Sequence, residues 1–286
     1  MTRLFPSPAL VALLLALTFA AAAARAEEVR PLTFGVINQR SPVLTAEYWN
    51  PILDYVSARA GIVLELRIGR SAPETVEMAV RGELDFVYSN NLFAPGQQAL
   101  GFRVIARPAT DSIRGQIVAL EDSPLRSLAD LQGREVVFPS RVAFVGYQLT
   151  GDALVKAGVT VKALFAGNQE GAMAQLKAGG AEAAAVNASV LADFARREGL
   201  KTRTLWSSPL FPDIPVMAGP TVTEPVALAV REALVGMADT AEGRAILTRA
   251  AEAAGIKPVS FTRASDADYE PYRAFYRDAA LDRLPK

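Results

Sequence analysis

Residues 32–68 read LTFGVINQRSPVLTAEYWNPILDYVSARAGIVLELRI, and this stretch decides the fold class. Its first segment, 32–37, is a short apolar run of the kind that forms a buried strand. A helix then begins at Ser41-Pro42, because serine caps helices and proline is favoured in the first turn. Apolar side chains follow at helical spacing, at Leu44, Tyr48, Ile52, Tyr55 and Val56. Gly61 ends the helix, and the rest of the stretch is a second strand.

The same alternation continues along the chain. It predicts a helix over 73–81 and a strand over 84–88, which complete a βαβαβ unit. A second series of strands and helices lies over 116–205. A return crossing is then marked by Pro209, Pro212, Pro215 and Pro220, and the chain finishes in helices. The last of these carries an aromatic stripe typical of packing, formed by Tyr269, Tyr272, Phe275 and Tyr276.

This order of elements predicts an α/β protein with two lobes. At this length a single core tends to divide into two. We expect residues 27–110 and 218–286 to form the first lobe and 111–217 the second, with two chain crossings as a hinge. In such sheets ligands bind beyond the carboxyl ends of the strands, often at helix N-termini. A ligand cleft between the lobes follows.

The composition excludes several classes of function. The chain has 286 residues, with 30 basic and 30 acidic side chains, no cysteine and no histidine. It therefore has no disulfide framework, thiolate metal site, cysteine nucleophile or His-dependent triad. Balanced charge argues against a nucleic-acid partner. The sequence contains no GxSxG, SxxK, Walker A or GxGxxG pattern, so we expect no catalytic residue, no metal site and no cofactor.

The amino terminus has the three parts of a secretory signal. A basic start that contains Arg3 precedes an apolar run over 9–24, and small residues flank Arg25 before the cleavage point. The run is shorter than the roughly 20 residues that a membrane span needs. We therefore predict a signal peptide over 1–26, cleavage after Ala26 and a periplasmic mature protein.

Motifs spread over nearly all of the mature chain carry a resemblance to a known family. They are FGVI (34–37), YWNP (48–51), GELD (82–85), DSPLRSLADLQGR (122–134), FAG (165–167) with Glu170, SPLFP (208–212), and Asp268-Tyr269 with Arg273. With them the sequence resembles the periplasmic phosphate/phosphite/phosphonate-binding family, PhnD-like solute-binding subunits of ABC importers. The resemblance implies the type II periplasmic-binding-protein fold, two lobes that close by a hinge on a small solute.

The residues with which that family holds its ligand are replaced here. Its Ser-Thr-Ser run at the start of a second-lobe helix is replaced here by VAF (142–144). Its tyrosines after the second and third strands are replaced by Ala72 and Ser89, and its histidine is replaced by NQ (168–169). The resemblance therefore implies the frame, and the ligand has to be inferred from the side chains in these loops.

Polar side chains at the predicted strand ends are the candidate ligand residues. Arg40, Arg70 and Arg141 each follow a different strand, and a guanidinium suits carboxylates and oxyanions. A solvated loop arginine is the alternative for each. We expect Arg141 to act as the anion anchor in place of the hydroxyl run, and Trp49 and Trp206 to pack. The full candidate set is Arg40, Ser41, Arg70, Tyr88, Ser89, Asn90, Ser140, Arg141, Gln169 and Asn187.

Two functions remain open. The leading interpretation is a periplasmic solute-binding protein that captures a small anion between its lobes for an ABC importer. The anion is a phosphonate- or phosphate-like oxyanion or a carboxylate. The alternative is a ligand-sensing module that signals to a membrane histidine kinase. The expected partners are the anion and either an ABC permease or a membrane sensor kinase, without nucleic acid, and we expect a monomer.

Overall fold

The computed structural model describes residues 30–110 and 112–280. The expected signal peptide and its cleavage site lie outside these residues. The chain from Leu32 onward forms one compact unit. Within the described chain, no helix has both the length and the apolar content that crossing a bilayer requires.

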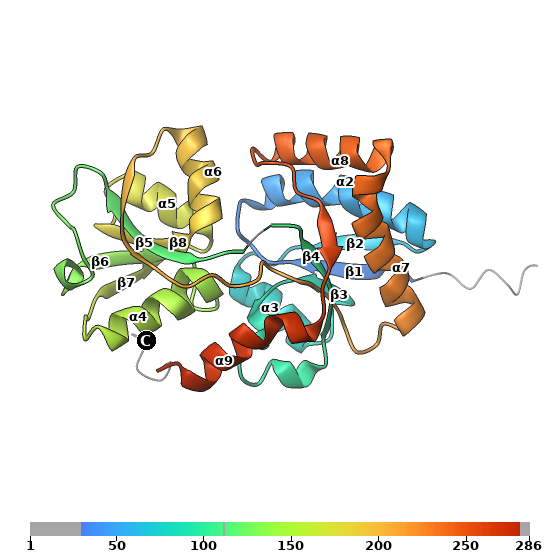
Figure 1. The fold of residues 1–286 in the computed structure, drawn as a ribbon, viewed down its shortest axis with the longest axis horizontal. Helices are drawn as coiled ribbons and strands as arrows, with labels where there is room; N and C mark the ends of the chain where they lie inside the picture. The colour runs from blue at the N-terminus through green and yellow to red at the C-terminus, as the bar shows by residue number, and fades with distance from the viewer. Residues whose placement is uncertain (1–29, 111, 281–286) are drawn as a thin grey trace, which may run out of the picture. The chain divides into compact units, whose positions relative to one another are not determined.

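The first sheet has six strands in the order β11-β4-β10-β3-β1-β2 (Figure 1). Its strands are β1 (Leu32–Val36), β2 (Leu64–Arg67), β3 (Phe86–Tyr88), β4 (Arg103–Pro108), β10 (Val216–Ala218) and β11 (Phe261–Arg263). Strand β1 runs parallel to β2 and β3, whereas β10 is antiparallel to β3 and β4. The sequence pattern does not predict β11, because three residues are too few to show an alternation.

The second sheet has five strands in the order β7-β6-β8-β5-β9. They are β5 (Gly115–Leu120), β6 (Glu135–Phe138), β7 (Lys162–Phe165), β8 (Ala183–Asn187) and β9 (Thr202–Ser207). Strand β6 is parallel to β7 and β8, and β5 is antiparallel to β8 and β9. The prediction of an α/β protein with two series of strands is confirmed.

The chain passes between the two sheets twice, after β4 and again after β9. The two crossing segments pair with each other: the Ile113 N–H donates to the Phe211 carbonyl at 2.8 Å, and the Phe211 N–H donates to the Ile113 carbonyl at 2.8 Å. Strands β10 and β11 then return to the first sheet. This path brings the last quarter of the chain back against the first.

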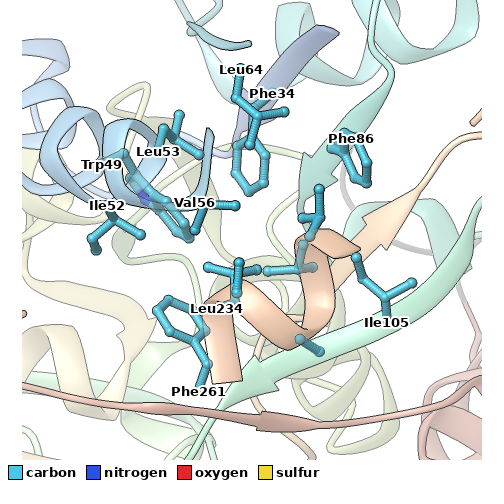
Figure 2. Packing of buried hydrophobic residues seen from close by; sticks show 14 of the residues in the cluster. Phe34, Trp49, Ile52, Leu53, Val56, Leu64, Phe86, Ile105, Leu234 and Phe261 are labelled. Carbon is cyan, nitrogen blue, oxygen red and sulfur yellow. The ribbon is translucent and has the colours of Figure 1, made fainter. Parts of the chain in front are cut away.

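Helices cover one face of the first sheet with a large apolar core. They are α2 (Pro42–Ala60), α7 (Glu224–Val235) and α8 (Ala241–Ala253). Helix α2 begins as expected, because the Ser41 side chain accepts the Leu44 N–H at 3.3 Å, and it ends at Gly61, whose φ of 68° favours glycine. Figure 2 shows this core, in which the Phe34 ring of β1 lies near Trp49 of α2, with ring centroids 5.1 Å apart, and Phe86 of β3 lies on the other side of Phe34.

The remaining faces are covered in the same way. Helices α3 (Ala72–Val80) and α9 (Glu270–Asp278) pack on the other face of the first sheet, and the expected packing role of the aromatic stripe is confirmed, since Tyr269 and Tyr272 are fully buried. On the second sheet, α4 (Leu149–Lys156) covers one face, and α5 (Gln169–Lys177) and α6 (Ala188–Glu198) cover the other. Short 3₁₀ turns are η1 (Asn91–Phe93), η2 (Gln98–Leu100), η3 (Ala129–Leu131), η5 (Gly236–Asp239) and η6 (Asp266–Tyr269).

Candidate solute-binding site

Two adjoining cavities lie beyond the carboxyl ends of strands from both sheets. The large cavity, of about 320 Å³, is lined among others by Arg40, Tyr48, Trp49, Tyr88, Asp213 and Lys257. The small cavity, of about 20 Å³, is lined among others by Asn90, Ser140, Phe144 and Gln169. Both are lined by Ile37 and Gln39, which follow β1, and by Asn187, which ends β8. Both sheets therefore contribute residues to the walls of these two cavities.

The small cavity is lined by side-chain amides that already form hydrogen bonds within the protein. The Gln169 Oε1 accepts the Asn187 N–H at 2.9 Å, and the Asn90 Nδ2 donates to the Tyr272 hydroxyl at 3.3 Å. A Cβ at position 146 would lie 2.9 Å from the Gln169 Nε2, so Gly146 allows this close approach. The Ser140 hydroxyl also lies at this cavity, and it is buried without a hydrogen-bond partner. A space of about 20 Å³ holds roughly one water molecule.

Phe144 sets the size of the small cavity. It begins the π-helical turn η4 (Phe144–Gln148) that leads into α4. Its ring stacks on Tyr272 of α9 with centroids 4.1 Å apart, and Phe211 of the second crossing lies edge-on at 5.0 Å. These rings hold Phe144, which is 1% exposed, in the space between the two sheets.

Aromatic side chains form one wall of the large cavity. Tyr48 and Trp49 come from α2, and Tyr88 ends β3; the ring centroids of Trp49 and Tyr88 are 4.8 Å apart. Burial raises the pKa of Tyr48 to about 12, against the opposing effect of the Arg40 charge, and burial also raises that of Tyr88. Among the described residues, neither hydroxyl has a hydrogen-bond partner. Both phenols are therefore neutral donors at physiological pH.

Arg40 brings a positive charge to the large cavity. Its side chain is 15% exposed and faces two carboxylates of the second sheet's helices, with Nε 3.9 Å from the Glu170 Oε1 and Nη2 3.6 Å from the Asp193 Oδ2. Both separations exceed hydrogen-bond length. The buried Nε has no hydrogen-bond partner. The guanidinium is thus electrostatically balanced while retaining an unused donor.

Two further cations line the large cavity. Arg196 is paired with Asp193 at 2.9 Å. Lys257, in the segment between α8 and β11, is exposed, and its ammonium group forms no ion pair or hydrogen bond with another described residue. Lys257 is therefore available to an anionic solute.

Asp213 is a buried carboxyl group with its own partners. Its Oδ2 accepts the Thr110 hydroxyl at 2.6 Å, and its Oδ1 accepts the Ile214 N–H at 2.7 Å. Burial raises its pKa, with these hydrogen bonds and the Arg107 charge opposing. The Thr110 contact ties the second crossing to the beginning of the first.

The structure brings six of the ten predicted site residues to the cavities. Arg40 and Tyr88 line the large cavity, Asn90, Ser140 and Gln169 line the small one, and Asn187 lines both. The other four have different surroundings and lie outside both linings.

Those four residues have contacts of their own. Ser41 caps α2, and the Ser89 hydroxyl accepts the Asn91 N–H at 3.1 Å. The Arg70 side chain is 92% exposed and pairs with Glu74 at 3.1 Å. Arg141 is exposed, and its guanidinium lies 4.4 Å from the centre of the Phe165 ring. The expected anchoring role of Arg141 stays a prediction.

Sequence reasoning did not select several residues of the large cavity. Trp49 was expected only to pack, which it does, and it also forms part of the cavity wall. Tyr48 stands one residue before it, within the helix pattern that predicted α2. Asp213 lies among the prolines of the second crossing, and Lys257 in a loop without any motif. No local signal marks these residues as neighbours, because they come together only through the two crossings.

Comparisons with known proteins agree with this architecture. Residues 34–269 match the sequence model of a family described as ABC transporter, phosphonate, periplasmic substrate-binding protein. The chain belongs to this family. As a periplasmic substrate-binding protein of the phosphonate family, it is a component of an ABC transporter. No curated protein matches the sequence.

Several solved structures share this fold at low sequence identity. PA3383, a binding protein component of an ABC phosphonate transporter from Pseudomonas aeruginosa, is 17% identical, with 85% of this chain and 84% of that chain covered and a TM-score of 0.74. PhnD1 from Prochlorococcus marinus, in complex with methylphosphonate, is 19% identical over 89% and 99%, with a TM-score of 0.74. XAC2383 from Xanthomonas citri, bound to ATP, is 17% identical over 89% and 99%, with a TM-score of 0.69. The fold is that of type II periplasmic binding proteins.

Proposed function

We propose that this substrate-binding protein captures a small anion between its two sheets and delivers it to an ABC permease. The observation that carries the proposal is the buried Arg40 Nε, which has no hydrogen-bond partner and belongs to a cavity lined by both sheets. A hydrogen bond from a charged donor to an anion is about twice as strong as a neutral one. An anion would complete the coordination of this guanidinium.

Closure of two lobes on the solute is part of the proposal. The lobes are 27–110 with 218–286, and 111–217, and the hinge is the pair of crossings. Arg40, after β1, faces Glu170 and Asp193 of the helices on the second sheet, and the Glu170 N–H donates to the Gln39 carbonyl at 3.4 Å. A solute held from both sides stabilises only the arrangement in which these contacts form, and so shifts the population toward it.

The relatives support an anionic solute. Methylphosphonate is bound by PhnD1, and ATP and chloride are bound in two structures of XAC2383. These ligands share a negative charge and differ widely in size. The charge class is therefore the part of their binding that we carry over to this chain.

Binding measurements on the purified mature protein test the proposal. We would screen methylphosphonate, phenylphosphonate, phosphate, phosphite, acetate and benzoate by thermal shift, and confirm hits by calorimetry. An anion at 100 times its Kd should add about 2.7 kcal/mol to stability, or about 5–10 °C in Tm for a chain of this size. Stabilisation by neutral or cationic solutes alone would contradict the proposal.

The membrane partner is tested in cells. We propose that the protein acts as a monomer in the periplasm after removal of residues 1–26. Deleting its gene should abolish uptake of the bound anion, and size-exclusion chromatography with light scattering should give the monomer mass. Normal uptake together with loss of a transcriptional response to the anion would favour the sensor-kinase alternative.

A further inference from the structure

We propose that the solute is an organic anion, a phosphonate or carboxylate with an apolar body that fills the large cavity, and that this site discriminates against small inorganic oxyanions. The inference rests on the proposed function, because it names the substrate class of the same site. It follows from the difference in size between the two cavities and from the groups that line the larger one.

The small cavity has no room for the head of such a solute. Its volume of about 20 Å³ suits one water molecule, and the buried Ser140 hydroxyl offers that water a partner. Phe144 cannot move aside without losing its stack on Tyr272 and its contact with Phe211. A tetrahedral oxyanion is therefore excluded from the place nearest the start of the helix that contains α4.

The large cavity has both the volume and the apolar surface for an organic body. Its volume of about 320 Å³ lies at the lower end of the range for small-molecule sites. The rings of Tyr48, Trp49 and Tyr88 form one wall, and Ile113 and Val190 contribute from the first crossing and from α6. A methyl group or a bare oxyanion would leave most of this apolar surface without a partner.

Positive charge in the large cavity selects an anionic head. Arg40 keeps a buried Nε without a hydrogen-bond partner, and the Lys257 ammonium has no partner among the described residues. The acidic side chains of the lining are occupied, since Asp193 pairs with Arg196 and Asp213 accepts from Thr110 and from a main-chain N–H. The unsatisfied groups are therefore donors, which suit a carboxylate or phosphonate and not an ammonium group.

Three anions distinguish the contribution of the charged head of the solute from that of its apolar body: phenylphosphonate, methylphosphonate and inorganic phosphate. The measurement uses the Trp206→Phe protein, in which Trp49 is the one remaining tryptophan of the two in the chain. Since Trp49 lines the large cavity, its fluorescence reports occupancy of this cavity. We expect phenylphosphonate to change Trp49 emission and to bind about ten- to a hundredfold more tightly than methylphosphonate, in line with burial of an aromatic ring.

Two lysine variants, one at the large cavity and one away from it, test where the anionic head of the solute binds. Lys257→Gln should weaken phenylphosphonate binding about three- to tenfold, because a hydrogen bond to a charged group is lost at a partly exposed site. Lys201→Gln is the matched control, since Lys201 is also exposed and lies outside both cavity linings, and it should bind like the parent.

The outcomes distinguish this inference from the proposed function. Equal affinity for phosphate, methylphosphonate and phenylphosphonate would overturn the inference and leave anion capture intact. Phenylphosphonate binding that leaves both Trp49 emission and the Lys257→Gln affinity unchanged would also overturn it, by placing the solute outside the large cavity. Failure of every anion in the wider screen would overturn the proposed function itself.

Discussion

The loop after β1 and the loop after β6 occupy equivalent places in the two sheets, but opposite kinds of side chain enter the space between them. In the first loop a charged residue, Arg40, lines the large cavity. In the second loop an apolar residue, Phe144, fills the space, and the neighbouring Arg141 is exposed and lies over Phe165. The first loop therefore lines the cavity in which we propose that the solute binds, and the second contributes to packing.

The difference comes from what each loop meets across the space. Arg40 faces the carboxylates of Glu170 and Asp193, which compensate for the burial of its charge. Phe144 instead meets the aromatic rings of Tyr272 and Phe211, where a charge would have no partner. A position at a strand end therefore fixes where the backbone of a residue lies. Whether its side chain enters the space between the sheets depends on elements that are far away in the sequence.

Phe144→Ala should give the largest effect that tests this contrast. Removing a fully buried ring from a packed cluster costs about 3–5 kcal/mol, which for this chain lowers Tm by about 6–20 °C. The same change at Phe275, a half-buried ring 5.3 Å from Phe144, should cost clearly less. Thermal unfolding of both variants measures this, and equal losses would show that Phe144 is not the centre of the cluster.

Arg40→Ala should weaken anion binding about ten- to a hundredfold, the value of one hydrogen bond to a charged group. Arg40→Lys should recover only part, because lysine keeps the charge and loses the planar fork. Glu170 keeps its pair with Arg197 and Asp193 its pair with Arg196, so both variants should fold like the parent. Calorimetry with the bound anion decides, and unchanged affinity in Arg40→Ala would remove Arg40 from the site.

Arg141→Ala should have a smaller effect, and on a different quantity. Loss of its contact with the Phe165 ring at an exposed site should cost about 0.5–1 kcal/mol of stability. Anion affinity should stay within about twofold of the parent, because Arg141 lies outside both cavity linings. A tenfold loss of affinity would instead support the anchoring role expected from the sequence and would reverse the contrast between the two loops.

The smallest expected effects are on two tyrosines. Burial raises the pKa of Tyr48 and of Tyr147, and the neighbouring Arg40 or Arg141 opposes this in each case. Arg40→Ala should therefore raise the pKa of Tyr48 further above about 12, and Arg141→Ala that of Tyr147. A tyrosine with a raised pKa contributes stability below pH 10 that is lost as the pH rises toward its folded pKa, so in each variant this loss should continue to a higher pH than in the parent.

Absorbance titration of phenolate formation, with chemical unfolding at pH 8 and 11, checks both tyrosine shifts. Arg67→Ala, an exposed arginine outside both loops, is the control and should leave the titration unchanged. A downward shift in either arginine variant would contradict the stated electrostatics.

Much of the fold followed from local patterns. Helix α2 was predicted with its cap at Ser41 and its end at Gly61, because each of these signals lies next to the helix end that it marks. The π-helical turn at Phe144 was not predicted, because it has no pattern of its own and its first ring stacks on Tyr272 of α9. Strand β11 was missed because pairing with β4, and not composition, makes it a strand.

The candidate site was predicted less completely. The rule that strand ends carry ligand loops led to Arg40, Tyr88 and Asn187, because the carboxyl ends of parallel strands meet at one edge of a sheet. The same rule selected Arg70, which lies outside both cavities, because its nearest charge is Glu74 on its own helix and it remains in solvent. Spacing along the chain does not reveal which loop arginine meets a partner from the other sheet.

The α/β class, the succession of strands and helices and the absence of thiol and imidazole chemistry can be inferred from periodicity, caps and composition, which are local properties of the chain. The binding-protein family was indicated by motifs such as DSPLRSLADLQGR (122–134). The fold brings Lys257, Asp213 and Trp49 to the same cavity as Arg40, and places Phe144 in the wall of the small cavity. The physical reason is that burial, charge pairing and ring stacking act between residues that only the two chain crossings bring together.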